Sequence, residues 1–257
     1  MNQNIDIRIS SNADSAANFV ASEIANLLKE NPSVTLGLAT GGTPVEVYRR
    51  LVEINQRGDI SFADCTTFNL DEYVGLEPDH DQSYRYFMQK NLFDYVDVNR
   101  DRTHVPDGVA VDLQAACSDY ESRIKSAGGI DLQLLGIGMN GHIAFNEPGS
   151  DPNGRTSVVE LTDNTIAANS RFFEKAEDVP RQAVTLGIGT ILEADRIILM
   201  ATGSNKAEAV ARALVSEPNL DSPASYLQTK KNVTFVLDAE AARLLPKSVI
   251  EASVLIT

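Results

Sequence analysis

The feature that most constrains the fold of this chain is a repeated unit: a short apolar run, a turn that contains glycine, and then an amphipathic helical pattern. Strand-length apolar runs that alternate with helical patterns predict a mostly parallel sheet with helices on both faces. We count about seven strand candidates, and their uneven spacing favours an open sheet over a barrel. The sequence therefore predicts an α/β fold with an open, doubly wound sheet.

The predicted elements follow one another without a linker rich in proline, glycine or serine. The segments with strand character are 5–10, 34–39, 64–70, 131–138, 195–201 and 232–237. The segments with helical spacing are 12–29, 44–51, 83–93, 112–124, 205–214 and 239–245. Ser11 or Asn12 is expected to cap the first helix. We expect one domain over 1–257, and residues 140–183 form a stretch too long for a plain connection, which indicates a functional loop.

Composition and charge exclude several classes of protein. The chain has 257 residues, of which 43% are hydrophobic and 23% charged, as is typical of a globular protein with a real core. Its 22 basic and 36 acidic residues give a net charge of −14. This acidic balance argues against a nucleic-acid partner, whose binding surface is basic. An anionic substrate would need a local positive pocket within this negative field.

The cysteines and the apolar segments point to a cytoplasmic protein. Cys65 and Cys117 are too few and too far apart for a disulfide framework or a CxxC metal site. The first residues lack the basic flank and apolar run of a secretory signal. No apolar stretch approaches the roughly 18 residues that a membrane span needs. We therefore expect neither secretion nor a membrane partner.

Polar and glycine-rich residues follow four of the predicted strands. Ligands of an open parallel sheet bind beyond the carboxyl ends of its strands, so we expect these segments to form one site. They are Thr40-Gly41-Gly42-Thr43-Pro44, Asn69-Leu70-Asp71-Glu72, Gly138-Met139-Asn140-Gly141-His142 and Thr202-Gly203-Ser204-Asn205-Lys206.

Two of the four segments have features of anion-binding loops. Gly41 and Gly42 let backbone N–H groups approach an anion at a helix start, where the helix dipole favours negative charge. Lys206, in the first turn of another predicted helix, can pair with a phosphate. Taken singly, a glycine turn with Thr43 as N-cap and a solvated lysine are the simpler interpretations. Neither segment is a Walker or GxGxxG motif, so the pair favours a phosphorylated small molecule over a nucleotide.

The other two segments carry residues suited to acid/base chemistry. Asp71 follows an apolar strand, where desolvation raises the pKa of a carboxylate and suits it to a general base. A turn or N-cap aspartate is the alternative. His142 has Asn140 and Glu147 nearby, and a histidine beside a carboxylate moves protons near neutral pH. The alternative is a hydrogen-bonded loop histidine. The other two histidines are not at ligand spacing, so no metal site is expected.

At these residues the chain resembles the glucosamine-6-phosphate deaminase family. The matching segments are LGLATGGTP (36–44), FNLDEYVGL (68–76), LGIGMNGHIAFNEPGS (135–150), NSRFF (169–173) and GSNKA (203–207). They agree with the family in order and spacing over essentially the whole chain. The resemblance implies a Rossmann-like open sheet, shared with phosphogluconolactonases and ribose-phosphate isomerases. It also implies conversion of glucosamine 6-phosphate and water into fructose 6-phosphate and ammonia, without a metal or organic cofactor.

The resemblance further implies a role for each matching residue. Asp71 stands where the family has the base that moves a proton between C2 and C1. His142 stands at the ring-opening acid/base, and Glu147 is its supporting carboxylate. The phosphate-binding positions are Thr40, Gly41, Gly42, Thr43, Arg171 and Lys206. The stretch around 155–185 corresponds to a mobile lid.

Asn140, which we count among the catalytic residues, departs from the best-known pattern of the family. Many members have Asp at this place, whereas shorter bacterial members resemble this chain in carrying Asn. We therefore expect activity, with an altered proton relay. An amide cannot stabilise an imidazolium as a carboxylate does, so Glu147 is left as the only carboxylate of the relay.

The resemblance also bears on regulation. Larger, hexameric members are activated by N-acetylglucosamine 6-phosphate through basic residues after an Arg-Thr pair and an aromatic residue near a longer C-terminus. Here Ser157 and Val159 follow Arg155-Thr156, and the chain ends at Thr257. Binding a phosphate there would cost free energy, because the anion would lose its water and find no cation to pair with. We expect hyperbolic kinetics and a monomer or small homo-oligomer, as in the shorter, non-allosteric members.

Two other functions remain as alternatives. A 6-phosphogluconolactonase-type hydrolase has a related fold, but FNLDEYVGL followed by GHIAFNEP argues against it, and ammonia release would separate the two. A non-enzymatic sugar-phosphate sensor would need a DNA-binding module, and no helix-turn-helix precedes the first strand. The choice between glucosamine and galactosamine 6-phosphate depends on a contact to the C4 hydroxyl, which the sequence does not reveal.

Overall fold

Eight parallel strands form the central sheet of the computed structural model, which describes residues 5–170, 173 and 175–256. Their order is β11-β1-β10-β9-β6-β2-β3-β5, and all neighbouring strands pair in parallel. The bounds are β1 Ile5–Ser10, β2 Thr35–Leu38, β3 Thr66–Asn69, β5 Thr103–His104, β6 Leu132–Leu135, β9 Arg196–Ala201, β10 Val233–Asp238 and β11 Val254–Ile256. The predicted open α/β sheet is confirmed.

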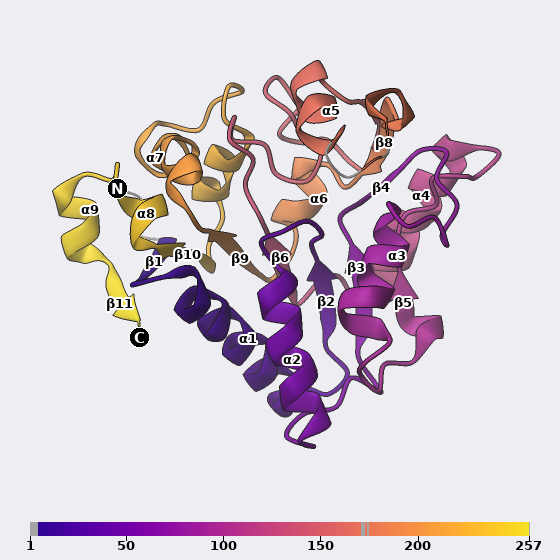
Figure 1. Cartoon of the computed structure of the whole chain (residues 1–257), viewed down its shortest axis with the longest axis horizontal. Coiled ribbons are helices and arrows are strands. Elements are labelled where there is room, and N and C mark those ends of the chain that lie inside the picture. Colours follow the sequence, from indigo (N-terminus) through magenta and orange to yellow (C-terminus); the bar gives the residue numbers. More distant parts are fainter. Residues whose placement is uncertain (1–4, 171–172, 174, 257) are drawn as a thin grey trace.

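A second, small sheet lies beyond the carboxyl ends of the central strands (Figure 1). Its strands β4 (Asp71–Tyr73), β8 (Gln182–Thr185) and β7 (Ser157–Glu160) pair antiparallel in that order. Helix α5 (Asp163–Asn169) follows β7 and packs over the same end of the molecule. The sequence did not predict this sheet, because β7 and β8 fall in the long stretch that shows no clear period.

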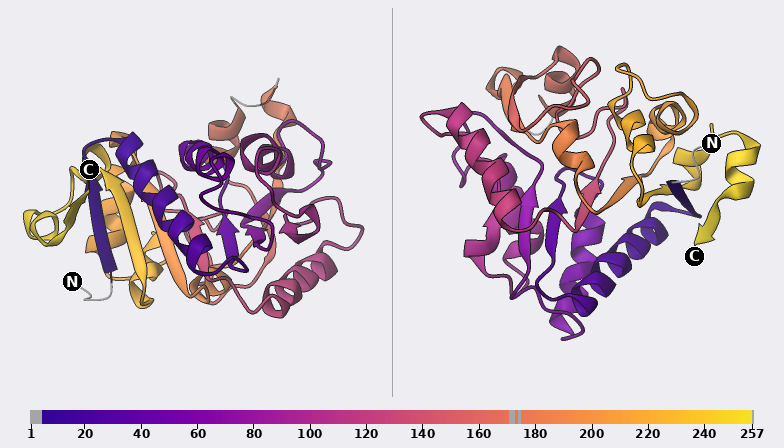
Figure 2. Two further views of the ribbon diagram at one scale, coloured as in Figure 1. Left: turned by 90° about the horizontal axis from the view of Figure 1, so that it is seen from below. Right: turned by 180° about the vertical axis from the view of Figure 1, so that it is seen from behind.

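Helices cover both faces of the central sheet. Helices α1 and α2 lie on one face, and α4 lies on the other (Figure 2). The bounds are α1 Ala13–Glu30, α2 Val45–Gln56, α3 Tyr84–Met88, α4 Leu113–Ser126, α6 Ile188–Leu192, α7 Ala207–Val215, α8 Ala239–Ala242 and α9 Lys247–Ala252. No helix in the described ranges is long and apolar enough to cross a bilayer.

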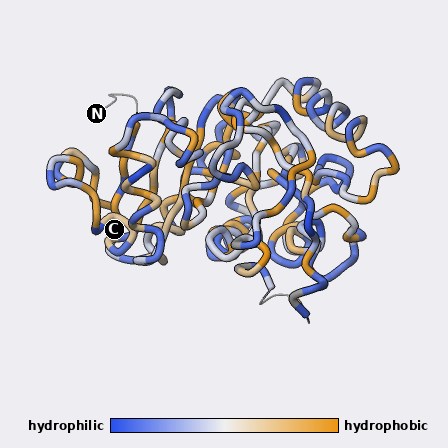
Figure 3. Tube along the Cα trace, turned by 90° about the horizontal axis from the view of Figure 1, so that it is seen from above, coloured by the Kyte–Doolittle hydropathy of each residue, from blue (hydrophilic) through white to orange (hydrophobic). Residues whose placement is uncertain are grey.

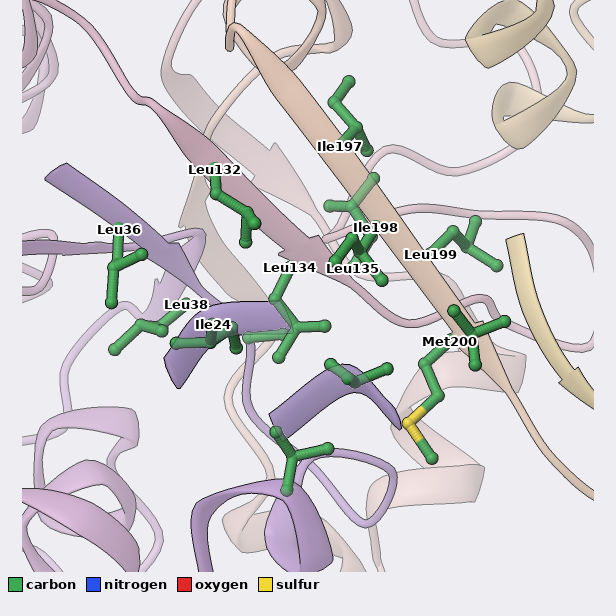
Figure 4. Close-up of a cluster of buried hydrophobic side chains, with 14 of the residues drawn as sticks. Ile24, Leu36, Leu38, Leu132, Leu134, Leu135, Ile197, Ile198, Leu199 and Met200 are labelled. Atoms are coloured by element: carbon green, nitrogen blue, oxygen red, sulfur yellow. The ribbon is translucent and has the colours of Figure 1, made fainter. Parts of the chain in front are cut away.

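The core lies between the central strands and α1. Strands β2, β6 and β10 are buried at every position, as is typical of a parallel sheet with helices on both faces. The sheet strands are coloured toward the hydrophobic end in Figure 3, whereas the peripheral loops are mostly hydrophilic. Ile24 of α1 packs in the cluster with Leu36 of β2 and Leu134 of β6 (Figure 4).

The structure corrects several predicted bounds and the count of about seven strands. The missed strands β5 and β11 have two and three residues, which is too short to show a period. The predicted helix 83–93 ends as α3 at Met88 and continues as a π-helical turn over Gln89–Phe93. Pro44 is the N-cap of α2 rather than its first residue. The helix predicted at 239–245 ends at Ala242, and α9 follows it.

The structure also selects one of the two predicted caps of α1. Asn12 is the N-cap, and its side-chain oxygen accepts a hydrogen bond of 2.8 Å from the backbone N–H of Ser15. We expect Asn12→Ala to lower the free energy of unfolding by about 1 kcal/mol, because an N–H in the first turn loses its acceptor. Ser11→Ala is the matched control and should change it by less than about 0.5 kcal/mol. Urea unfolding measures both, and equal losses would show that Asn12 does not cap α1.

Candidate functional site

The candidate site lies where the chain reverses its direction across the central sheet. From β2 the chain moves outward through β3 to β5, and it then returns to β6 on the other side of β2 before continuing to β9 and β10. The segments that follow β2 and β6 therefore run away from one another. In open α/β sheets such a reversal leaves a crevice at the carboxyl ends of the strands, where ligands bind. The predicted segments 40–44 and 138–142 flank this crevice.

The segment after β2, which we call the glycine loop (residues 40–43), presents open space at the start of α2. Gly41 has a φ of 91°, in the left-handed region that favours glycine. A Cβ on Gly41 or Gly42 would meet no described atom within 4 Å. Because a 12-residue helix begins at Val45, the loop combines room for an anion with the positive end of a helix dipole.

Lys206 reaches the crevice from the turn after β9. Its Nζ donates a hydrogen bond of 2.6 Å to the carbonyl oxygen of Ile137. The turn is fixed by β10, because the Gly203 N–H donates to both carboxylate oxygens of Asp238 at 3.0 Å. The Lys206 ammonium thus lies beside the segment that follows β6. Arg171, the other predicted cation, lies outside the described residues.

Asp71 is a buried carboxylate at the start of β4. It belongs to the small sheet, whereas the sequence placed it at the end of the preceding strand. It is 6% exposed, and no described residue donates a hydrogen bond to its carboxylate. Burial, followed by the charge of the neighbouring Glu72, raises the pKa of Asp71 to about 8. A carboxylate with such a pKa is suited to accept a proton from carbon near neutral pH.

His142 lies in the segment after β6, which we call the histidine loop (residues 138–147). A Cβ on Gly138 would come within 2.3 Å of the imidazole ring, so only glycine leaves room for the ring at this place. The N–H of Gly138 also donates to the carbonyl of His142 at 2.9 Å. Ala144 has a φ of 51°, which is unusual for a residue with a Cβ. Backbone strain of this kind clusters at functional sites.

Glu147 is the carboxylate that faces His142. Its Oε1 lies 3.5 Å from Nδ1 of His142, and its Oε2 accepts a hydrogen bond of 2.6 Å from the Asn140 amide. Burial acts to raise the pKa of Glu147, but hydrogen bonds and the charge of His142, with further donors, lower it to about 2. Glu147 is therefore ionised and can stabilise an imidazolium. The Asn140 amide orients this carboxylate, and its Oδ1 also accepts a hydrogen bond of 3.2 Å from the backbone N–H of His142.

Two threonines that no sequence motif indicated contact Glu147. The Thr165 hydroxyl donates to Oε1 of Glu147, and the Thr162 hydroxyl lies 3.5 Å from the same oxygen. They are 18 and 15 residues away in sequence. No local spacing links residues so far apart, and only the position of α5 over the histidine loop brings them together.

Hydrogen bonds and ring contacts join these segments into one site. Thr185 pairs with Asp71 across the small sheet, and its hydroxyl accepts the Phe145 N–H of the histidine loop at 3.1 Å. The Thr40 hydroxyl of the glycine loop lies next to the hydroxyl of Tyr84. The Tyr84 ring stacks on Phe145 with centroids 6.0 Å apart. The strand ends that carry the predicted residues thus meet, as expected for parallel strands.

A separate cavity of about 590 Å³ lies on the side of the central sheet opposite to the candidate site, at the amino ends of its strands. Residues at the amino ends of β1, β9 and β10 line it, Asp6, Arg196 and Asn232 among them. No predicted site residue lines this cavity, and open parallel sheets bind ligands at the carboxyl ends of their strands instead. Among the residues that the structure describes, no group of three or more His, Cys, Asp or Glu side chains is placed to hold a metal ion.

Comparison with known proteins identifies one family over most of the chain. The model of the glucosamine-6-phosphate isomerases/6-phosphogluconolactonase family matches residues 9–236. A glucosamine-6-phosphate deaminase of Rhodopirellula baltica is 54% identical over 243 residues, covering 95% of this chain and 97% of the relative.

Solved structures agree with this family. That of a monomeric glucosamine-6-phosphate deaminase has a TM-score of 0.91 at 44% identity and covers 93% of this chain and 99% of that one. A 6-phosphogluconolactonase of Trypanosoma brucei has a TM-score of 0.75 at 21% identity, over 94% of this chain and 98% of that one, which shows a shared fold alone. The chain therefore belongs to the glucosamine-6-phosphate isomerase/6-phosphogluconolactonase family, as its motifs predicted.

Proposed function

We propose that this protein is a glucosamine-6-phosphate deaminase, which converts glucosamine 6-phosphate and water into fructose 6-phosphate and ammonia. The observation that carries the proposal is the buried carboxylate of Asp71, whose pKa of about 8 suits a general base. Thr185 joins Asp71 to the histidine loop, which carries the His142–Glu147 pair, and Tyr84 lies between this loop and the glycine loop. The relative from Rhodopirellula baltica, 54% identical, bears the same name and supports the assignment.

The substrate phosphate binds at the glycine loop. Backbone N–H groups of residues 40–43 face it from the start of α2, and the Lys206 ammonium supplies a positive charge from the neighbouring turn. Thr43 adds a hydroxyl, and Arg171 adds a second cation. Binding a remote phosphate fixes the reacting carbons beside Asp71, and such positioning contributes several kcal/mol to catalysis.

His142 opens the sugar ring, and Glu147 supports it. The imidazole moves a proton from the C1 hydroxyl to the ring oxygen, which gives the open-chain aldehyde. The imidazolium that forms on the way is stabilised by the ionised Glu147, 3.5 Å from Nδ1. Asn140 holds Glu147 through its amide and takes no proton itself.

Asp71 then carries out the isomerisation. Its carboxylate removes the C2 proton, which gives an enolamine, and returns a proton to C1, which gives an imine at C2. Water adds to the imine, and ammonia leaves with the electrons of the C2–N bond. The products are fructose 6-phosphate and ammonia.

Residues around 155–185 act as a lid in this proposal. Two residues of α5, within this segment, donate hydrogen bonds to the site: Thr165 donates to Glu147, and the Asn169 amide donates to the Tyr73 hydroxyl at 2.8 Å. Opening the lid breaks both contacts. Arg171 belongs to this segment, so closure over the substrate brings its positive charge to the phosphate.

Ammonia release tests the proposed function directly. Purified protein is incubated with glucosamine 6-phosphate, galactosamine 6-phosphate or 6-phosphogluconolactone, and ammonia and acid production are followed separately. We expect ammonia from an amino-sugar phosphate and no lactone hydrolysis above the spontaneous rate. Acid release from the lactone without ammonia from either sugar would replace the proposal with a hydrolase.

Asp71→Asn should abolish turnover, because an amide cannot accept the C2 proton. Substrate affinity by calorimetry should change little, and solvent deuterium should no longer enter C1 of the product. Because the pKa of Asp71 is about 8 in the folded protein and near 4 in the unfolded chain, folding takes up a proton on Asp71 between about pH 4 and 8. The contribution of Asp71 to the free energy of unfolding therefore falls as the pH rises through that range. In urea unfolding at several pH values, the variant should lose the part of the pH dependence that Asp71 contributes, whereas the part from Glu72, whose pKa burial raises to about 7, should remain. Continued deuterium incorporation would contradict the role of Asp71.

His142→Gln should impair ring opening more than proton transfer, because glutamine does not exchange protons near neutral pH. The variant should recover part of its rate on a substrate that is supplied in the open-chain form. The relevant measurement is the ratio of kcat/KM for an open-chain analogue to that for the cyclic sugar. An unchanged ratio between wild type and variant would assign His142 to another step.

Regulation by a second sugar phosphate is not expected from the surface near Arg155. Its guanidinium pairs with the carboxylates of both Glu121 and Glu193, which neutralise it. The next positions, Ser157 and Val159, bring no charge. We expect hyperbolic kinetics in steady-state assays, with no change on addition of N-acetylglucosamine 6-phosphate. Sigmoidal kinetics that become hyperbolic with this compound would overturn the expectation.

A further inference from the structure

We infer that Glu72 is a positioning residue for the proposed reaction. It fixes the start of α3, which places Tyr84 between β4, the glycine loop and the histidine loop. When Glu72 is ionised, its negative charge also acts on the adjacent Asp71 carboxylate. The inference rests on the proposed function, because that function makes Asp71 the base. It concerns a buried acid beside Asp71 to which the mechanism above gives no role.

The carboxylates of Asp71 and Glu72 differ in their hydrogen bonds. The two residues are neighbours on β4, so they face opposite sides of the strand, and they are 6% and 3% exposed. Oε1 of Glu72 accepts the N–H groups of Tyr73 at 2.9 Å and Tyr84 at 2.8 Å, and Oε2 accepts that of Arg85 at 2.9 Å. No described donor bonds to the Asp71 carboxylate. Glu72 is therefore held by the backbone, whereas Asp71 is available to a substrate.

Glu72 supplies the acceptors that the start of α3 needs. The first N–H groups of a helix have no partner within the helix. At α3, Tyr84 and Arg85 donate theirs to Glu72, and Tyr86 donates its own to the Ser83 hydroxyl at 3.0 Å. Because Glu72 precedes Tyr84 by 12 residues, this cap comes from another strand rather than from the local sequence. The position of α3 relative to β4 is thereby fixed.

Tyr84, placed by this cap, connects the three parts of the site. Its hydroxyl lies next to Thr40 of the glycine loop, and its ring packs against the ring of Tyr73 on β4 with centroids 5.0 Å apart. Its ring stacks on Phe145 of the histidine loop at an interplanar angle of 5°. Tyr73 also accepts from the Asn169 amide of α5 at 2.8 Å. A shift of the α3 start would move all of these contacts together.

Glu72 adds an electrostatic effect when it is ionised. Burial raises the pKa of Glu72 to about 7, although three backbone N–H groups and the charge of Arg85 act to lower it. Glu72 faces Arg85 of α3, whose guanidinium also donates to the Thr103 hydroxyl and carbonyl at 2.9 Å. Although Asp71 and Glu72 face opposite sides of β4, their charges interact, and the charge of Asp71 also acts on the hydroxyls of Tyr73, Tyr84 and Tyr120. After burial, Glu72 is the cause that raises the pKa of Asp71. Neutralising Glu72 lowers the pKa of Asp71, because a like charge no longer opposes its ionisation.

The test is the pH dependence of ammonia release by Glu72→Gln. The acid limb of the kcat/KM profile reports ionisation of the base in the free enzyme. We expect this limb to move to lower pH by about one unit. The plateau kcat should also fall, because a glutamine side chain has one acceptor oxygen for three N–H groups. An acid limb that stays in place overturns the inference.

Ser83→Ala is the matched control. It removes the other side-chain acceptor at the start of α3 and changes no charge. We expect it to lower the urea midpoint while leaving the acid limb where it is in the wild type. If Ser83→Ala moves the limb as far as Glu72→Gln does, the effect follows from loosening α3 in general, and the electrostatic role of Glu72 is refuted.

A second measurement serves if Glu72→Gln does not fold. Wild-type protein labelled with ¹³C at its aspartate and glutamate carboxyls is titrated by NMR. We expect the Asp71 and Glu72 signals each to respond to the ionisation of the other, as in a coupled pair. An Asp71 signal that titrates without any response at Glu72 overturns the inference. Absence of ammonia release by the wild type would instead refute the proposed function, and the titration would still decide whether the two carboxyls are coupled.

Discussion

The pairing of β2 with β6 is the constraint on which the candidate site depends. The two strands pair in parallel at Leu36 with Leu132 and at Gly37 with Gln133. Gly37 makes this possible, because a Cβ at that position would lie 2.1 Å from Oε1 of the buried Gln133 side chain. Once β6 lies beside β2, the glycine loop and the histidine loop leave the sheet on either side of one crevice. The phosphate-binding and proton-transfer parts of the proposed mechanism follow from that arrangement.

Asp71 and Glu147 are carboxylates of the same site with opposite pKa shifts. Burial acts to raise the pKa of Asp71 and of Glu147 alike. Glu147 receives hydrogen bonds from Asn140 and Thr165, so its pKa falls to about 2, whereas Asp71 receives none from the described residues and its pKa rises to about 8. The same type of group is thus prepared as a permanent anion in one place and as a proton acceptor in the other. Opposite shifts of this kind are how a site separates acid and base roles.

Much of the central sheet could be predicted because its strands are buried and rich in apolar residues. Six predicted segments correspond to β1, β2, β3, β6, β9 and β10, whose apolar runs are continuous or alternate regularly. The two-residue β5 and the three-residue β11 lie at the sheet edges and carry too few residues to show a pattern. The small sheet escaped prediction for a different reason. Its strand β4 is separated from β3 by Leu70 alone, so the sequence indicates one continuous strand. In the structure the chain passes at Leu70 from the central sheet to the small sheet.

The sequence by itself determined the local features of this protein. It placed the cap of the first helix at Ser11 or Asn12, the glycine that allows a φ of 91° at position 41, and the polar residues that follow four of the strands. These features depend on neighbours a few residues apart, whose geometry the backbone sets. Only the tertiary structure decided that Glu72 holds the start of α3 and that Thr165 donates to Glu147, across 12 and 18 residues. Such contacts depend on which segments the order of strands brings within about 3 Å of one another. A hydrogen bond between residues so far apart in sequence produces no local sequence pattern.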